Sequence, residues 1–542
     1  MERLSTTPAP RLTTAETIAV ALTMMLAIAA LAGYVIDAAG FGVQPLAAAA
    51  AAVLAAGVVA WRLPCDHTVR RSDVFAWFGI VVFVGAMLLR LSWPHLVPPG
   101  RGSDLTHHLL LVDYIEQHGH LVHDRSLSGA MGEMAHYTPG SHLLAVMAGR
   151  WFGADGLRAF YPLIVLCAAL AAGFVFLIAR RILLPMPFAI AAVVLLCLPA
   201  PYFFGAFTQD AFLAQSVSTL FAVAMWWALV AWHDLRATAV AWVMALCLAA
   251  TFLSWPVFVG PPLIVFLAML SGANLPAPAR WRHLAIVVVP WLALVLLHSW
   301  DRWGWMTIVS ASGAVLRPSL DSVGWLVPIL AATGAILAMS DIRARITGIL
   351  LVVIGLQSLT LFILAAANDA DTPYMALKMM YLAIYPMAVL GAFAVTRLTG
   401  ESRVTEPLGW LVAAALVIAA RPVFNAPRPI PVVDADLYAA GKLVRAQGAA
   451  ACVDYLVTDS QTAYWLHLAV LGNPRSSDRT REIDVYDPNA AIAPWITAAG
   501  RNYAIADLRL LPDEVRSQVD IAAQIGHAAV ITRRGVTMKG CD

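Results

Sequence analysis

The chain has 542 residues, of which 61% are hydrophobic and only 13% are charged. A soluble domain of that composition could not cover its own surface with polar groups, so most of the surface must face lipid. The formal net charge is only +2, and the basic residues do not form a long run. This charge pattern excludes electrostatic binding to nucleic acid as the main function.

Hydrophobic windows of about 17–25 residues mark membrane-spanning helices. The first such window is long enough to span and follows a short polar segment, so we expect a retained helix rather than a cleaved signal. The sequence predicts thirteen spans, near 15–37, 42–61, 73–93, 157–179, 183–206, 211–232, 237–254, 257–271, 284–300, 322–340, 346–367, 379–396 and 406–421.

Arginines predict the sidedness of these spans. If the N-terminus is cytoplasmic, every inside loop carries at least one arginine: Arg62, Arg70, Arg71, Arg180, Arg181, Arg236, Arg280, Arg282, Arg343, Arg345, Arg397 and Arg403. The odd number of spans then places the C-terminal segment outside, where a disulfide between Cys452 and Cys541 is chemically permitted. The preference for arginine over lysine is typical of a GC-rich bacterial genome, so we expect a multi-pass protein of a bacterial inner membrane.

The first long extracytoplasmic loop, 94–156, contains two helical patterns. The first starts at Asp104, with His107 and His108 three and four residues later, so all three crowd one end of a helix lying in the membrane interface. The second follows the run His136-Tyr137-Thr138-Pro139-Gly140, in which Thr-Pro-Gly is by itself a helix-start signal.

Simpler interpretations of these loop residues stay open. Aspartate is a favoured helix N-cap, and the histidines fit solvated side chains at the interface equally well. Asp104, His107 and His108 could also hold a divalent metal, but no further ligand follows at a conventional spacing. We therefore assign no metal site and no cofactor, and a divalent metal stays an alternative.

Two further segments on the outer side contain candidate binding residues. Gln209 and Asp210 stand where a span begins, and an acid at that depth is costly without a partner; it is a site candidate or a second helix cap. Arg302 lies among tryptophans that suit stacking on a sugar ring, although an interfacial aromatic belt explains them too.

Lys378 is the only lysine in the first 441 residues, and it lies just outside a predicted span. In a chain that otherwise uses arginine, this position suggests an anion-binding role, with Tyr374 beside it. The alternative is a lysine that extends to the interface and anchors the helix end.

The C-terminal segment, 422–542, is polar and follows a proline-rich linker. It alternates helical stretches with three β-like runs, at 452–457, 503–506 and 528–532. We therefore expect two domains: an all-α membrane domain over 1–421 and a small extracytoplasmic α/β domain over 422–542, with nothing catalytic in the second.

The loop motifs in combination resemble those of the GT-C superfamily of membrane glycosyltransferases, such as mannosyl-, arabinosyl- and aminoarabinosyltransferases. The resemblance covers about 70–421 and rests on an aspartate that opens an interfacial helix before His-His, and on aromatic-x-Pro-Gly before a second helix. Thr138 replaces the first proline of the commoner Tyr-Pro-Pro-Gly motif, and three spans rather than one precede the loop. These departures leave the subfamily open.

The resemblance implies an inverting transferase that moves a sugar from a polyprenyl-phosphate donor to an extracytoplasmic glycan, lipid or protein. It implies that Asp104 is the general base. The other candidates are assigned by position to the donor phosphate (Lys378, Tyr374, Arg302) and to the substrates (His107, His108, His136, Tyr137, Asp210, Gln209). An oligosaccharide polymerase or ligase, and a lipid-linked glycan transporter or flippase, are the alternatives.

Overall fold

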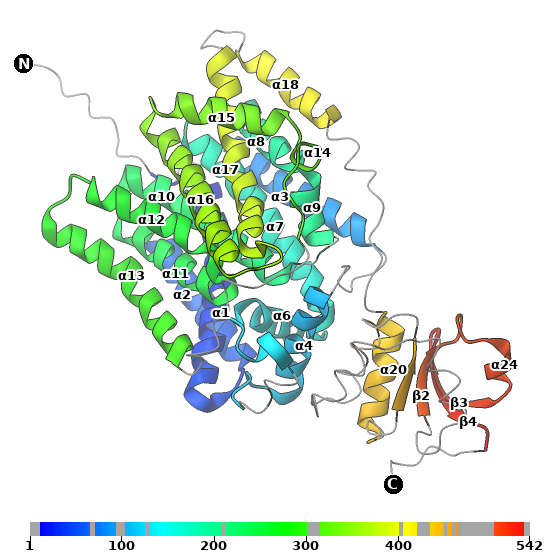
Figure 1. The fold of residues 1–542 in the computed structure, drawn as a ribbon. Helices are drawn as coiled ribbons and strands as arrows, with labels where there is room; N and C mark the ends of the chain where they lie inside the picture. Colours follow the sequence, from blue (N-terminus) through cyan, green and yellow to red (C-terminus); the bar gives the residue numbers. More distant parts are fainter. Residues whose placement is uncertain are drawn as a thin grey trace, which may run out of the picture.

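The computed structural model describes residues 11–65, 71–93, 103–124, 127, 131–208, 210, 212–300, 315–399, 405–419, 434–448, 453–457, 462, 466 and 503–535. A body of apolar helices makes up most of it, and a small sheet with a covering helix lies beside one end of that body (Figure 1). This arrangement confirms the predicted mostly helical fold with a small C-terminal α/β part.

The helical body is formed, in chain order, by α1 (Thr14–Ile36), η1 (Asp37–Phe41), α2 (Pro45–Arg62), α3 (Arg71–Ser92), α4 (Ser103–His118), η3 (Gly132–Ala135), α6 (Gly140–Phe152), α7 (Gly156–Arg181), α8 (Met186–Cys197), α9 (Ala200–Thr208), α10 (Leu213–Leu235), α11 (Thr238–Ser254), η4 (Pro256–Phe258), α12 (Gly260–Ser271), α13 (Ala277–Trp300), α14 (Leu320–Val323), α15 (Leu326–Ala338), α16 (Ile342–Ala367), α17 (Tyr374–Thr399) and α18 (Thr405–Ala419).

The lengths of these helices identify a multi-pass membrane protein. Within the described ranges, eight helices are long and apolar enough to cross a bilayer, and α8 with α9, bent by 77°, would form a ninth span. Each predicted window coincides with an apolar helix. Four of these apolar helices have only 10–17 residues and are shorter than the helices that can span a membrane: α11, α12, α15 and α18. Thirteen crossings are therefore not established.

A buried network of charges joins four helices at the end of the body where α1 begins. Arg181 of α7 pairs with Glu16 of α1 at 2.8 Å and with Asp234 of α10 at 3.4 Å. Arg343 of α16 donates to the same Asp234 at 2.8 Å, and the indole of Trp227 donates to Glu16 at 3.0 Å. Buried charges need such partners, so these contacts fix the four helices relative to one another.

The other end of the body carries the helices of the first long loop. Figure 1 shows α4 and α6 (cyan) together at the end of the body that is nearer to the C-terminal helix α20. Both helices lie between α3 and α7, in the predicted loop 94–156, and neither is among the helices long enough to span. The Trp151 indole of α6 donates to the Pro45 carbonyl at the start of α2 at 2.9 Å, which fixes the loop to the spanning helices.

The C-terminal part is a four-stranded sheet in the order β1-β2-β4-β3, with β1 parallel to β2 and the other pairs antiparallel. Its elements are α20 (Ala435–Ala446), β1 (Val453–Leu456), β2 (Tyr503–Asp507), α24 (Asp513–Arg516), β3 (Val519–Ile525) and β4 (Ala528–Arg533). The three predicted strands are confirmed. β3 was not predicted, because this edge strand is largely exposed and its pairing with β4 has an irregular register.

One buried carboxylate connects this C-terminal part to the loop. Asp113 of α4 accepts a hydrogen bond from the Tyr438 hydroxyl of α20 at 2.9 Å and pairs with Arg445 at 3.4 Å. Asp113 and Tyr438 are 4% and 5% exposed, so the contact is closed to water. Burial, and next the charge of Asp113, raise the pKa of Tyr438, which keeps its hydroxyl a donor.

Close packing of α15 on α17 gives the first testable prediction. A Cβ at Gly334 of α15 would overlap the Leu390 backbone carbonyl of α17, whereas a Cβ at Gly355 of α16 would meet nothing within 4 Å. Small residues let membrane helices approach in this way. We expect Gly334→Ala to lower the stability of the purified protein by about 1–3 kcal/mol, because packed helices must separate.

The matched control is Gly355→Ala, for which we expect a thermal unfolding midpoint at or above that of the wild type, since alanine favours helix. Thermal unfolding in detergent measures both variants. Equal midpoints for Gly334→Ala and Gly355→Ala would contradict the close approach of the two helices.

Candidate functional site

Two histidines from the loop helices form the centre of the candidate site. His108 Nδ1 of α4 lies 3.0 Å from His142 Nε2 of α6, and the two side chains are 4% and 0% exposed. Asp104 lies in the first turn of α4, one helical turn before His108. Its side chain is outside the described residues, so its predicted role is not tested by contacts.

The Thr-Pro-Gly run holds α6 against a break between two helices. The Thr138 hydroxyl donates to the Ser254 carbonyl at 3.3 Å, where α11 ends. A Cβ at Gly140 would lie 2.9 Å from the Leu253 carbonyl, so only glycine permits this approach. The run therefore does more than begin a helix, because it positions α6 and His142 next to the break.

Tyr137 and Trp255 connect the histidine pair to the interior of the body. The Tyr137 ring stands edge-on to His108 and to His142, at centroid distances of 5.2 and 5.6 Å. On its other side it contacts Trp255 at 6.0 Å. Trp255 lies in the break between α11 and η4, with an extended backbone that no helix continues.

Lys378 lies within a cluster of aromatic rings that includes Trp255. Its ammonium is 2.8 Å from the ring centroid of Phe212 and 4.8 Å from that of Tyr374, and Trp255 and Tyr381 follow at 6.0 and 5.9 Å. The side chain is only 1% exposed. The interpretation of Lys378 as an anchor extending to the interface is therefore wrong. Cation–π contacts offset part of the cost of burying its charge.

Asp210 lies near the same cluster. It is close enough to Tyr381 to interact with it electrostatically, and its backbone N–H donates to the Gly205 carbonyl at 3.1 Å. It does not cap the following helix, because α10 begins after Phe212, which holds the N-cap position. The helix-cap alternative is thus wrong, whereas a binding role for Asp210 stays a prediction.

The remaining candidates are less central or not described. The His107 side chain is partly exposed, and its Nδ1 lies 3.9 Å from the Glu133 carboxylate. His136 follows directly after η3. His107 and His108 thus contact different partners. Gln209 and Arg302 are outside the described residues.

Within the described ranges, potential metal ligands converge in the C-terminal part, at Asp434, Asp436 and His527. His527 Nε2 lies 2.8 Å from Asp434 and its Nδ1 lies 2.9 Å from Asp436. Each ring nitrogen therefore faces its own carboxylate, which is the geometry of an ion pair that ties α20 to the turn between β3 and β4. The cluster belongs to the packing of this domain and is separate from the candidate site.

Sequence reasoning found His108, Tyr137, Tyr374 and Lys378 and missed most of what surrounds them. His142, Trp255 and Phe212 were not assigned to the site. The signal for His142 was its place two residues after Gly140, and the signal for Trp255 was the proline that follows it. Phe212 gave no signal, because a phenylalanine in an apolar segment is ordinary.

The structure of this chain is similar in fold to solved structures of other proteins. No protein-family model and no curated protein matches the sequence. The structure is similar to ArnT from Cupriavidus metallidurans bound to undecaprenyl phosphate, with a TM-score of 0.50 and 14% identity over 85% of this chain and 98% of that chain. The chain therefore shares its fold with this structure, and the resemblance of the loop motifs predicted a membrane fold of that kind.

Two further solved structures are similar at lower scores. One is the oligosaccharyltransferase AglB from Archaeoglobus fulgidus in complex with an inhibitory peptide and a dolichol-phosphate, with a TM-score of 0.48 and 12% identity over 80% of this chain and 69% of that chain. The other is the mycobacterial arabinofuranosyltransferase AftD, with a TM-score of 0.48 and 16% identity over 88% of this chain and 40% of that chain.

The buried histidine pair generates a prediction about pH. Burial, and next the neighbouring His108, hold the pKa of His142 well below its ordinary value of 6.5. In the unfolded chain His142 takes up a proton below pH 6.5, and in the folded protein it does not. Its contribution to stability is therefore present above that pH and is lost as the pH falls.

We expect the thermal unfolding midpoint to fall between pH 7.5 and pH 5.5 and the fall to be smaller in His142→Gln. The control is His118→Gln, because His118 is exposed at the end of α4. The same pH-dependent fall in wild type and His142→Gln would refute this account of the pair.

Proposed function

We propose that this protein is an inverting glycosyltransferase that moves one sugar from a polyprenyl-phosphate donor to an acceptor outside the cytoplasm. The observation that carries the proposal is the continuity of the buried Lys378 cluster, through Trp255 and Tyr137, with the histidines of α4 and α6. Two aromatic rings thus connect the Lys378 ammonium to α4, the loop helix whose first turn contains Asp104.

The fold supports this proposal. ArnT, which has the same fold, was solved with undecaprenyl phosphate, a polyprenyl phosphate. For this chain, a phosphate at Lys378 would lie among aromatic rings in a largely apolar setting, where an electrostatic contact is stronger than in water. Tyr374, at 4.8 Å from the ammonium, is placed to line the same phosphate site.

The chemical step follows from these assignments. The acceptor hydroxyl oxygen attacks the anomeric carbon from the face opposite the phosphate, as the bond from that carbon to the phosphate oxygen breaks. The hydroxyl proton passes to the Asp104 carboxylate, and the electron pair leaves with the polyprenyl phosphate. Lys378 stabilises the charge that develops on the departing phosphate. One displacement inverts the anomeric configuration.

The residues around this step have distinct proposed roles. His108 and Tyr137, which contact one another, would bind the sugar or the acceptor, and Asp210 would act from the side of Tyr381. The C-terminal domain would orient the acceptor, because α20 contacts the same helix that carries Asp104 and His108. A divalent metal is not needed by any of these assignments, and a chelator tests this point.

Two other functions are compatible with the same fold. An oligosaccharide polymerase or ligase would transfer a preassembled glycan rather than one sugar. A transporter or flippase would move the lipid-linked glycan without breaking a bond. The clustering of a cation, histidines and aromatic rings at one end of the body favours chemistry on that side over passage through the membrane.

The assignments predict that Asp104→Asn and Asp104→Ala lower sugar transfer by about 10²–10⁴-fold, because each removes the base. We expect Lys378→Met to lower it by about 10²–10³-fold, because the variant removes the cation at the leaving phosphate and keeps the buried volume. Transfer of labelled sugar from a polyprenyl-phosphate donor by the purified protein measures both effects.

The matched control is Asp321→Asn, since Asp321 is an exposed aspartate on α14. Thermal unfolding establishes that each variant is folded. Full transfer in both Asp104 variants would remove Asp104 as the base. Movement of labelled lipid across vesicles with no sugar transferred would instead identify a flippase, and transfer of only preassembled glycans would identify a ligase.

A further inference from the structure

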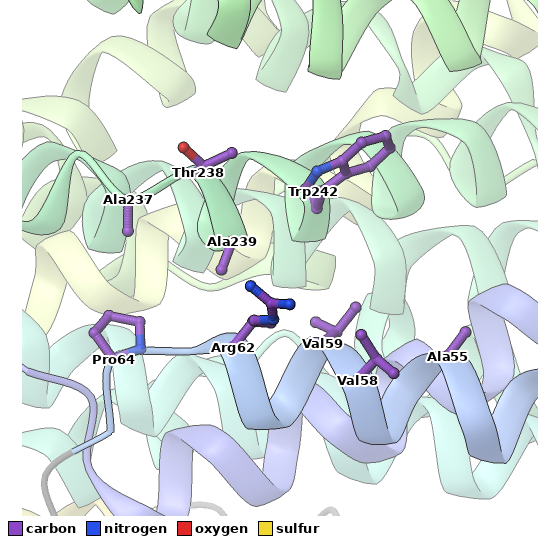
Figure 2. Close-up of a pocket in the computed structure, with 9 residues that line it drawn as sticks. All are labelled: Ala55, Val58, Val59, Arg62, Pro64, Ala237, Thr238, Ala239 and Trp242. Carbon is purple, nitrogen blue, oxygen red and sulfur yellow. The ribbon is translucent and has the colours of Figure 1, made fainter.

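A separate cavity lies between α2 and α11. It has a volume of about 750 Å³, within the range of about 300–1,000 Å³ typical of small-molecule sites. Figure 2 shows the side chains that line it from the two helices. They are Ala55, Val58, Val59 and Arg62 of α2, with Ala239 and Trp242 among those of α11.

The two walls of this groove differ from an ordinary lipid-facing surface. The α2 residues recur at intervals of three and four, so they form one stripe of the helix, and Arg62 is at its end. Figure 2 shows the Arg62 side chain projecting from α2 toward α11, near Ala239. The groove is therefore apolar along its length and cationic at one end.

The depth of the groove follows from the length of α2. The helix begins at Pro45, whose carbonyl is bonded to Trp151 of the loop helix α6. Its 18 residues span about 27 Å, close to the hydrocarbon thickness of about 30 Å. Arg62 thus lies one bilayer thickness from the loop, at the headgroup level of the opposite leaflet, and Ala55 lies at acyl-chain depth.

Neighbouring contacts join the end of α2 to the start of α1. Directly after Arg62, the Pro64 carbonyl accepts a hydrogen bond from Leu12 N–H at 2.8 Å, and Cys65 accepts one from Thr17 at 3.4 Å. Both partners are at the start of α1, beside Glu16 of the buried charge network. The groove is therefore at the arginine-rich end of the body, which is expected to face the cytoplasm.

The positive charge of Arg62 at one end of the groove favours an anionic ligand. Arg62 is exposed, its guanidinium lies 4.9 Å from the Trp61 ring, and across the described part of the chain no carboxylate is paired with it. A guanidinium binds a phosphate through two parallel hydrogen bonds.

We propose that this groove binds one anionic phospholipid of the leaflet opposite the candidate site, with its phosphate at Arg62 and an acyl chain between α2 and α11. The site is distinct from the one proposed for the polyprenyl-phosphate donor, because the two are at opposite ends of the helical body. It does not depend on the proposed reaction, and its test measures lipid binding rather than sugar transfer.

Native mass spectrometry of the purified full-length protein tests the proposal by titration with phosphatidylglycerol and with phosphatidylcholine of identical acyl chains. We expect the first phosphatidylglycerol to bind about fivefold more tightly than the first phosphatidylcholine, since one basic residue near anionic lipid contributes about that factor. Arg62→Gln removes this preference. Ala239→Trp, which fills the groove, removes the first tight binding of both lipids.

The matched control is Arg282→Gln, because Arg282 is an exposed arginine near the start of α13 and does not line the groove. It keeps the wild-type preference if the proposal holds. Equal binding of the two lipids to the wild type, or an unchanged preference in Arg62→Gln, overturns the proposal. Arg62→Gln alone decides the headgroup assignment if Ala239→Trp fails to fold, because Arg62 is an exposed residue.

Discussion

The ion pairs between Glu16, Arg181, Asp234 and Arg343 fix the frame on which the candidate site depends. Charges buried at this depth hold their helices in place, because moving one helix would leave a charge without its partner. Three of these four helices also contact parts of the candidate site. α10 begins next to Phe212, α7 begins where Gly156 donates to Glu116 of α4, and α16 packs on the helix that carries Lys378.

The sequence predicted the parts of the fold that follow from local pattern. Apolar windows predicted the helices, and the solitary Lys378 was found because lysine is rare in this chain. The rings around Lys378 could not be predicted, because they come from distant helix ends and because aromatic residues are common in membrane helices. His142 was missed for a related reason: its partner is 34 residues away, so only tertiary packing brings the pair together.

The Lys378 cluster illustrates how a membrane protein can place a charge where lipid would not accept it. Phe212 and Tyr374 lie close to the ammonium, and such contacts between a cation and aromatic rings offset part of the cost of burying the charge. Such a cation is held in one position by packing rather than by a flexible surface contact. Its electric field is thereby oriented before any anionic group arrives, which is the condition for efficient electrostatic catalysis.

The hydrogen bond between Tyr438 and Asp113 can couple the C-terminal domain energetically to the first long loop. α4 carries both Asp113 and His108, so a ligand that moved α4 through α20 would also move His108 relative to His142. Such coupling is reciprocal: occupancy at one end of α4 changes affinity at the other by the same factor. A substitution in the C-terminal domain that breaks the contact between Tyr438 and Asp113 can therefore affect the histidine pair without lying next to it.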